Sequence, residues 1–161
     1  MSLEESIGLL ASVALFELVE RDALRLMAFA AETRRLREDE FLFRQGERSD
    51  GGYVVVSGSL AVGQDGSDVV TLADRGTLIG KTALFLRTKR PASAWARERT
   101  EVLRISPTMM KRMLEEFPAA ALAIRDALAD DLAELSSDLH QAHVLLAGLD
   151  RAGASSKGHK S

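Results

Sequence analysis

The chain has 161 residues, of which 46% are hydrophobic, and this is enough for one domain with a buried core and some appended segments. It has no cysteine, which excludes disulfides, thiolate metal sites and cysteine nucleophiles and fits a reducing compartment, so we expect a cytoplasmic location. A formal net charge of -3 argues against attraction of nucleic acid to the whole surface, so any anion must bind at a local patch.

The N-terminal segment MSLEESIGLL is acidic where a signal peptide would be basic, and no apolar run approaches the roughly 20 residues that span a bilayer. We therefore expect a soluble protein without a membrane partner.

In the segment ERDALRLMAFAAE, residues 20–32, apolar residues recur at helical spacing, which predicts a helix before the first strand. These residues are Leu24, Met27, Ala28 and Ala31.

Eight of the twelve glycines lie between Gly46 and Gly80, where they separate short segments rich in β-forming residues. The segments 52–63 and 67–73 flank the tripeptide QDG, whose Asp-Gly supplies the positive φ of a tight hairpin. Further strands are predicted at 32–37, 40–44, 91–97 and 101–105. The spacing suits a mainly β protein with an antiparallel sandwich or roll.

Two helices are predicted after the strands. Pro107 fits the first position of one helix, because its missing N–H costs nothing there, and Pro118 interrupts that helix and begins a longer one that reaches Gly148. The longer helix carries apolar residues at a 4-3-4-3-4-3 spacing: Leu128, Leu132, Leu135, Leu139, Ala142, Leu146 and Leu149. Such a stripe packs either on the chain's own strands or against a second copy, and the strict heptad favours a homodimer.

Basic residues gather in the segment LIGKTALFLRTKRPASAWARERTEV, residues 78–102, whose charge is about +4 by the count of its side chains. They are Lys81, Arg87, Lys89, Arg90, Arg97 and Arg99, and the segment's two acids are Glu98 and Glu101. In an acidic chain, this is the local patch at which an anion would bind.

Residues 13–120 closely resemble the cyclic nucleotide-binding domain, the family of the catabolite activator protein and of protein kinase A regulatory subunits. The resemblance lies in FRQGE, in GGYVVVSGSLAV and in GTLIGKTALFLRTKRPASAWARERTEVLRIS. It implies an antiparallel, jelly-roll-like β-roll with N-terminal helices and a long C-terminal helix. The expected organisation is a helical extension (1–12), the roll with its opening helix (13–117), a dimerisation helix (118–149) and a disordered polar tail (150–161).

The family binds phosphate with a cassette that reads roughly G-E-x-A-L and, after a few residues, R-x-A-T/S. The resemblance places this cassette at Gly80, Lys81, Thr82, Ala83, Leu84, Arg90, Pro91, Ala92 and Ser93. It implies that Arg90 clamps the cyclic phosphate with two parallel N–H donors, a geometry that lysine cannot supply. The backbone N–H groups of 82–84 would add donors if they open a helical turn, and Ser93 would reach toward the base.

Lys81 departs from the family pattern, which has a glutamate that accepts a hydrogen bond from the ribose 2′-hydroxyl. An ammonium has no acceptor, so we expect the affinity for cyclic AMP to fall by about 10- to 150-fold. Pro91 is a milder departure, because it removes one backbone donor beside the clamp. The ligand is expected to be cyclic AMP or another phosphate-containing small molecule.

No catalytic fingerprint and no metal-binding set is found, so neither an enzyme nor a metal cofactor is expected; His140 and His143 lack a third ligand at suitable spacing. Trp95 continues a strand and is expected to pack in the core or at an interface. Only eleven residues follow Asp150, too few for a DNA-binding domain of the catabolite activator type, so direct DNA binding is not expected.

The preferred hypothesis is a dimeric sensor that signals through its C-terminal helix to a separate output protein. The alternative is a scaffold with a degenerate nucleotide pocket.

Overall fold

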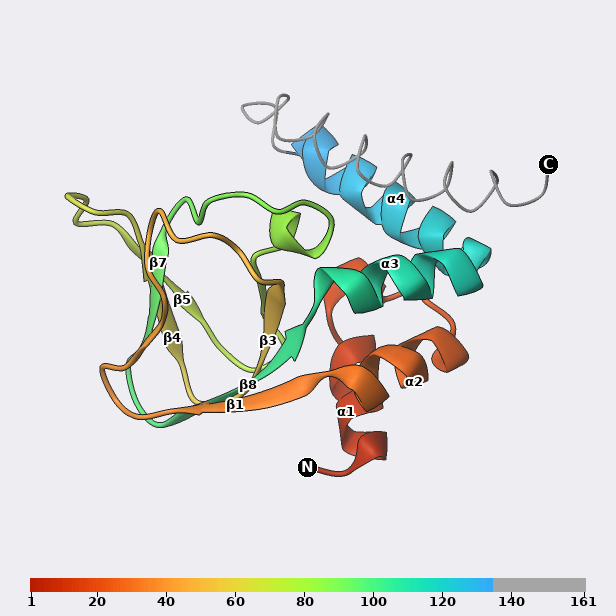
Figure 1. Ribbon diagram of the computed structural model, residues 1–161, viewed down its shortest axis with the longest axis horizontal. Coiled ribbons are helices and arrows are strands. Elements are labelled where there is room, and N and C mark those ends of the chain that lie inside the picture. Colours follow the sequence, from red (N-terminus) through yellow and green to blue (C-terminus); the bar gives the residue numbers. More distant parts are fainter. Residues whose placement is uncertain (135–161) are drawn as a thin grey trace. The chain divides into compact units, whose positions relative to one another are not determined.

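The computed structural model describes the backbone of residues 1–134 and the side chains of residues 1–130. The chain divides into two compact units, which Figure 1 colours by position in the sequence. One unit is Ala31–Pro107 and contains the strands of the described residues; the other combines Met1–Ala30 with the chain from Thr108 onward, and its described residues form helices.

The β unit is a roll of two four-stranded sheets in which every paired strand is antiparallel (Figure 1). Its strands are β1 (Glu32–Leu36), β2 (Phe41–Phe43), β3 (Gly52–Ser57), β4 (Leu60–Gly63), β5 (Val70–Ala73), β6 (Leu78–Ile79), β7 (Ser93–Ala96) and β8 (Thr100–Ile105). Sheet A has the order β1-β8-β3-β6 and sheet B the order β2-β7-β4-β5. The predicted antiparallel roll with flanking helices is therefore confirmed.

The glycines decide where the strands end. The predicted hairpin is present as β4 and β5, and Gly66 in its turn has a φ of 76°, which an L side chain rarely adopts. The segment 52–63, expected as one strand, breaks near Gly58 into β3 and β4, which lie in different sheets. The short edge strand β6 was not predicted, because two residues carry no periodicity.

The core of the roll lies between the inner faces of the two sheets. Tyr53, Val55 and Val102 are fully buried contributions from sheet A. Leu60, Ala94 and Ala96 are their counterparts from sheet B, and the remaining members are Leu36, Leu42, Phe43, Ala73 and Ile79. Because side chains alternate along a strand, Ser93 and Trp95 of β7 face the opposite side of sheet B from Ala94 and Ala96.

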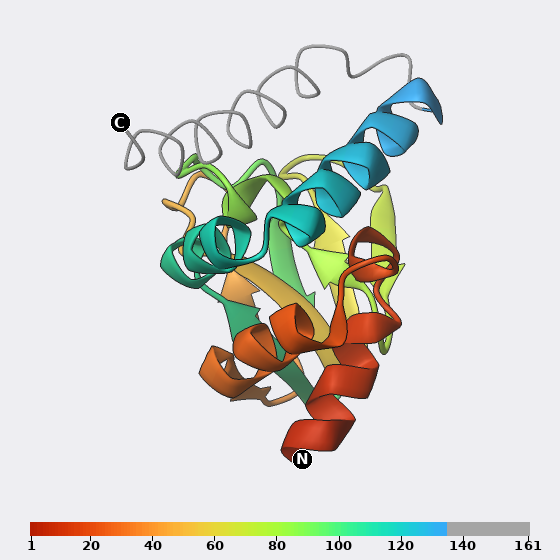
Figure 2. The same ribbon diagram turned by 90° about the vertical axis from the view of Figure 1, so that its right-hand side faces the viewer.

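The helical unit contains α1 (Leu3–Ala11), the 3-10 turn η1 (Ala14–Phe16), α2 (Arg21–Ala30), α3 (Pro107–Glu116) and α4 (Pro118–Glu134). The first residue of α3 belongs to the β unit. Figure 2 shows these helices from a second side. Both predicted proline positions are confirmed, since Pro107 and Pro118 are the first residues of α3 and α4. Ser2 caps α1 by accepting a hydrogen bond from the N–H of Glu5 at 3.1 Å. No helix among the described residues is long and apolar enough to cross a membrane.

The inner face of α4 is formed by Ala120, Ile124 and Leu128, which recur every four residues and are at most 1% exposed. Leu128 is therefore covered within a single chain, which differs from its predicted place on a seam between chains. Most of the other predicted seam positions, the helix up to Gly148 and the polar tail lie outside the described residues.

Candidate anion site

The predicted cassette begins with Gly80, whose φ is 78°, and continues into the 3-10 turn η2 (Thr82–Leu84). Within this turn the N–H of Ala83 donates to the Gly80 carbonyl at 3.0 Å and the N–H of Leu84 donates to the Lys81 carbonyl at 3.2 Å. These two N–H groups were expected to face an anion. A 3-10 turn instead uses them in its own i to i+3 hydrogen bonds.

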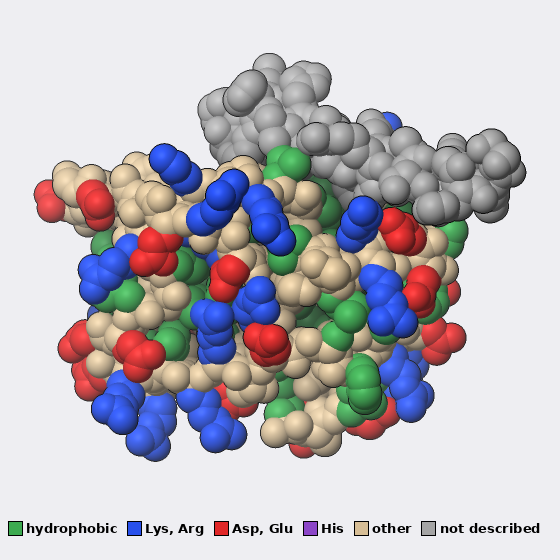
Figure 3. Space-filling model, viewed as in Figure 1, with side chains coloured by type: hydrophobic (Ala, Val, Ile, Leu, Met, Phe, Trp, Pro, Cys, Tyr) green, Lys and Arg blue, Asp and Glu red, His purple; other side chains and the backbone are tan. Residues whose placement is uncertain are grey.

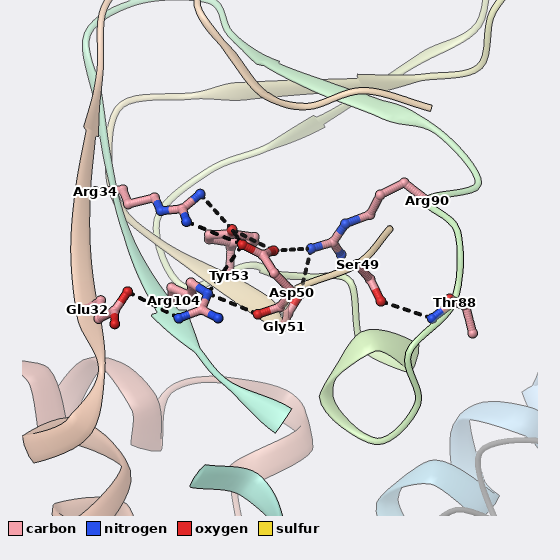
Figure 4. Close-up of polar contacts among 9 residues, drawn as sticks. All are labelled: Glu32, Arg34, Ser49, Asp50, Gly51, Tyr53, Thr88, Arg90 and Arg104. Carbon is pink, nitrogen blue, oxygen red and sulfur yellow. Dashed lines mark hydrogen bonds and ion pairs between the residues drawn. The ribbon is translucent and has the colours of Figure 1, made fainter. Parts of the chain in front are cut away.

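The backbone of Arg90 is fixed to the loop that precedes β3. The N–H of Arg90 donates to the Glu47 carbonyl at 2.8 Å, and the N–H of Gly46 donates to the Arg90 carbonyl at 2.9 Å. Ser49 and Thr88 exchange two further hydrogen bonds: Ser49 N–H to the Thr88 carbonyl at 2.8 Å, and Thr88 N–H to the Ser49 Oγ at 3.0 Å. Residues 88–90 and residues 46–49 thus form a short antiparallel ladder. Figure 4 draws part of it.

The residue Arg90 is only 4% exposed. Its Nη2 donates to Oδ1 of Asp50 at 2.9 Å and to the carbonyl of Gly51 at 2.8 Å, and its guanidinium carbon lies 4.1 Å from the centre of the Phe43 ring. A Cβ on Gly80 would lie 2.7 Å from Nη1 of Arg90, so a glycine is required there. The buried Nε of Arg90 has no hydrogen-bond partner among the described residues.

Asp50 lies at the centre of this polar cluster, as Figure 4 shows. Its carboxylate accepts hydrogen bonds from the Tyr53 hydroxyl at 2.9 and 3.0 Å and from Arg34 Nη2 at 3.2 Å, besides that from Arg90. Arg104 Nε lies 3.4 Å from Oδ2 of Asp50 and donates to the Asp50 backbone carbonyl at 2.9 Å. One carboxylate therefore faces three guanidinium groups.

This environment changes the acidity of two groups. Burial alone would raise the pKa of Asp50, but the hydrogen bond from Tyr53 and the charges of Arg104, Arg34 and Arg90 outweigh it, so that the pKa lies below its ordinary value. Burial and the hydrogen bond to Asp50 raise the pKa of Tyr53 to about 12. The carboxylate is thus ionised and the phenol is protonated near neutral pH.

Not all predicted cassette residues meet at Arg90. Ser93 is buried, but its Oγ accepts a hydrogen bond from the N–H of Gln45 at 2.8 Å, on the side of sheet B that faces away from the core. The carbonyl of the exposed Pro91 accepts a bond from Gln64 Nε2 at 3.5 Å. Ala92 and Lys81 are half-buried.

Sequence reasoning missed Asp50 and its partners Arg34 and Arg104. A signal was available in β1, where Arg34 pairs with the fully buried Val102 and so occupies an inner-face position of sheet A. A charged residue at an inner position of a strand needs a partner of opposite charge, and the polar run ahead of β3 supplies Asp50.

The surface shown in Figure 3 carries Lys and Arg side chains interspersed with Asp and Glu. The concentration of basic residues in the sequence is therefore not a single basic surface on this face. Among the described residues, no group of His, Cys, Asp and Glu could hold a metal ion.

The sheet order, the glycine-led turn and the buried arginine are those of a β-roll of the cyclic nucleotide-binding type. The chain belongs to the cyclic nucleotide-binding domain family, whose model matches residues 33–117, just over half of the sequence. It therefore carries a cyclic nucleotide-binding-like domain, and the domains of this family are regulatory domains that bind ligands.

Among solved structures, a cyclic nucleotide-binding-like protein from Brucella abortus is 36% identical, with a TM-score of 0.61 over 69% of this chain and 98% of that one. The C-linker/CNBHD of zELK channels, crystallised in the presence of cAMP, is 29% identical with a TM-score of 0.66, over 76% of this chain and 63% of that one. A lysophospholipase NTE1 from Phaeosphaeria nodorum is 27% identical over 118 residues, which are 70% of this chain but only 8% of that protein.

Proposed function

We propose that this protein is a regulatory sensor that binds a phosphate-containing small molecule such as cyclic AMP, and that Arg90 is its anion clamp. The module performs no catalysis of its own, and it acts in the cytoplasm by changing its contacts with a separate output protein. The zELK relative was crystallised in the presence of cAMP, and this makes cyclic AMP the first ligand to test.

The observation that carries the proposal is the unsatisfied donor on Arg90. A buried N–H without an acceptor costs about 1 to 3 kcal/mol, so native structures rarely keep one unless a ligand or water fills the position. Nε of Arg90 is such a donor among the described residues, and a Cβ on Gly80 would meet the same guanidinium at Nη1. A phosphate oxygen accepting from Nε would satisfy it.

Two features weaken binding of a cyclic nucleotide. Asp50 already accepts a hydrogen bond from Nη2 of Arg90, so a phosphate must compete with a carboxylate for part of the guanidinium. Lys81 stands where the family has a ribose-binding glutamate, and its ammonium offers no acceptor. The sensor therefore responds to high ligand concentration or to a ligand other than cyclic AMP.

A second function, a ligand-free interaction scaffold, is favoured by the same ion pair. The Asp50 carboxylate receives donors from Arg90, Arg34 and Tyr53, so Arg90 already has an anionic partner that supports the fold without ligand. In that case the cassette would be a structural part of the roll.

The discriminating experiment is calorimetry with cyclic AMP on four proteins: the natural chain, Lys81→Glu, Lys89→Glu and the double variant Lys81→Glu/Arg90→Ala. Lys81→Glu restores the ribose acceptor and should raise the affinity by about 10- to 150-fold. Lys89→Glu makes the same charge change at an exposed neighbouring residue and should not raise it. Removing Arg90 should abolish the gain, because the phosphate loses its clamp.

Two other outcomes would contradict parts of this proposal. If the natural chain binds cyclic AMP as tightly as Lys81→Glu does, the ribose contact contributes little to the affinity. If no variant binds cyclic AMP or inorganic phosphate, the pocket is closed and the scaffold function remains.

We also propose that the chain is a homodimer whose contact is the C-terminal part of the leucine seam, beyond the buried Leu128. Replacing Leu132 and Leu139 with Asp would place charges in an apolar seam and should give monomers in light scattering. A natural chain that is monomeric at micromolar concentration would contradict this proposal.

A further inference from the structure

A cavity of about 370 Å³ lies on the face of sheet B that points away from the core of the roll. Its lining consists of Phe41, Arg44, Gln45, Gly63, Gln64, Asp65, Ser67, Val70, Ser93 and Trp95. The volume is at the lower end of the range of small-molecule sites, about 300 to 1,000 Å³. Arg90 contacts Phe43 and Tyr53 in the core between the sheets, so the cavity is distinct from the candidate anion site.

The cavity exists because small residues lie among large ones on this face. In the register of the sheet, Ala61 lies opposite Trp95 and Gly63 lies opposite Ser93. A Cβ on Gly63 would lie only 3.3 Å from Cη2 of Trp95 and 3.5 Å from Cγ2 of Val70, so any side chain there would fill part of the space.

One wall of the cavity is aromatic. Phe41 and Trp95 occupy opposed positions on β2 and β7, and their ring centres are 5.8 Å apart with a tilt of 42°. The guanidinium carbon of Arg44 lies 3.8 Å from the centre of the Phe41 ring. Phe41 is 38% exposed, so this wall is accessible to a flat ring that could stack on it.

The rim is held in place by hydrogen bonds between loops that are distant in sequence. Gln45 Oε1 accepts from the N–H of Asp65 at 2.7 Å, and the N–H of Gln45 donates to Ser93 Oγ at 2.8 Å. Gln64 Nε2 reaches the Pro91 carbonyl at 3.5 Å. These bonds join the loop after β2, the β4–β5 hairpin and the start of β7, so the cavity is formed before any ligand arrives.

The rim carries one charge of each sign. Arg44 and Asp65 both line the cavity, and neither side chain forms an ion pair with a described residue. An anion alone could pair with Arg44 and a cation alone with Asp65, but either would leave the other charge without a partner. A ligand with both charges would satisfy both groups.

We propose that this cavity binds a small zwitterion that carries a planar ring, of which an aromatic α-amino acid is the simplest example. The ring stacks on Phe41 and Trp95, the carboxylate pairs with Arg44 and the ammonium pairs with Asp65. The site is independent of the function proposed for Arg90.

Trp95 is the single tryptophan of the chain and lines the cavity, so tryptophan fluorescence reports on its surroundings. The probes are L-phenylalanine, 3-phenylpropionate, which lacks the ammonium, and phenethylamine, which lacks the carboxylate. L-Phenylalanine should change the emission saturably and bind about three- to tenfold more tightly than either analogue, because each exposed ion pair contributes modestly. Ligand-detected NMR repeats the titration in case binding leaves the emission unchanged.

Variants assign the charges. Arg44→Ala should remove the preference for L-phenylalanine over phenethylamine, and Asp65→Asn should remove its preference over 3-phenylpropionate. Arg48→Ala and Asp68→Asn are matched controls, since both residues are exposed and lie outside the lining, and they should change neither preference. Gly63→Val should fill the cavity and abolish binding.

Circular dichroism and thermal melting establish that each variant is folded. Equal affinities for the three probes, preferences that survive Arg44→Ala and Asp65→Asn, or no binding by either method up to about 10 mM would overturn the proposal. Unchanged binding by a folded Gly63→Val protein would place the ligand elsewhere.

Discussion

Replacing Asp50 with asparagine should destabilise the roll and at the same time release Arg90 for an external anion. The substitution keeps the shape of the side chain and one oxygen acceptor but removes the negative charge that faces three guanidinium groups. The consequence differs between partners, because Arg34 is 40% exposed and can be hydrated, whereas Arg90 is 3% exposed and cannot.

The magnitude follows from this difference. A hydrogen bond to a charged group contributes about 1.5 to 3 kcal/mol when buried, and an exposed ion pair contributes about 0 to 1 kcal/mol. Asp50 is itself 42% exposed, so its contribution lies below the sum of its contacts. We expect Asp50→Asn to lower the free energy of unfolding by about 2 kcal/mol, which for a chain of this size is a fall in Tm of about 4 to 8 °C.

Urea denaturation followed by circular dichroism measures the change as a shift in midpoint at constant m. Asp68→Asn, an exposed acid in the β4–β5 hairpin, is the control and should stay within about 0.5 kcal/mol of the natural chain. A double-mutant cycle with Arg90→Met should give a coupling of about 1 to 3 kcal/mol. If Asp50→Asn leaves the midpoint unchanged, or if the coupling is zero, the ion pair does not support the fold and this reasoning is refuted.

Three further predictions concern the same cluster. Gly80→Ala should lower the free energy of unfolding by about 1 to 3 kcal/mol and displace Arg90, because a Cβ there meets Nη1. Gly66→Ala is the control, since Gly66 has a similar φ but a Cβ there would have no atom within 4 Å. The difference between the two urea midpoints therefore measures the effect of the contact with Arg90. The lowered pKa of Asp50 predicts stability that is present above its ordinary value of 3.8 and lost as pH falls through the folded-state pKa, and Asp50→Asn should remove this acid limb from a plot of midpoint against pH. The pKa of Tyr53, raised from 10.0 to about 12, predicts a second loss of stability as pH rises between these values, which Tyr53→Phe should abolish; a midpoint independent of pH in either range would contradict these assignments.

The fold was predictable because its signals are local. The Asp-Gly turn, the helical spacing in α2 and the prolines that open α3 and α4 each act within a few residues, and each prediction is confirmed. The change of sheet between β3 and β4 was not predictable, because it depends on long-range pairing of β3 with β8 and of β4 with β7.

The site was predictable only in part, for the same reason. Gly80 and Arg90 could be assigned by resemblance to a family motif, and the structure brings them together. Asp50 lies 40 residues before Arg90, and no pattern in the sequence couples the two. Ser93 follows Arg90 closely in the chain, yet strand alternation directs it to the other face of sheet B.

The ladder between the segments 46–49 and 88–90 determines how the clamp can move. Hydrogen bonds on both sides of Arg90 hold its Cα, so the peptide chain there should resist amide hydrogen exchange as well as the neighbouring sheet does. Exchange of Asp50 for another anion then requires a rotation of the Arg90 side chain alone, without opening of the sheet. Occupancy of Arg90 would therefore be recorded first as a change in the Asp50 cluster, while the strands of the roll keep their register.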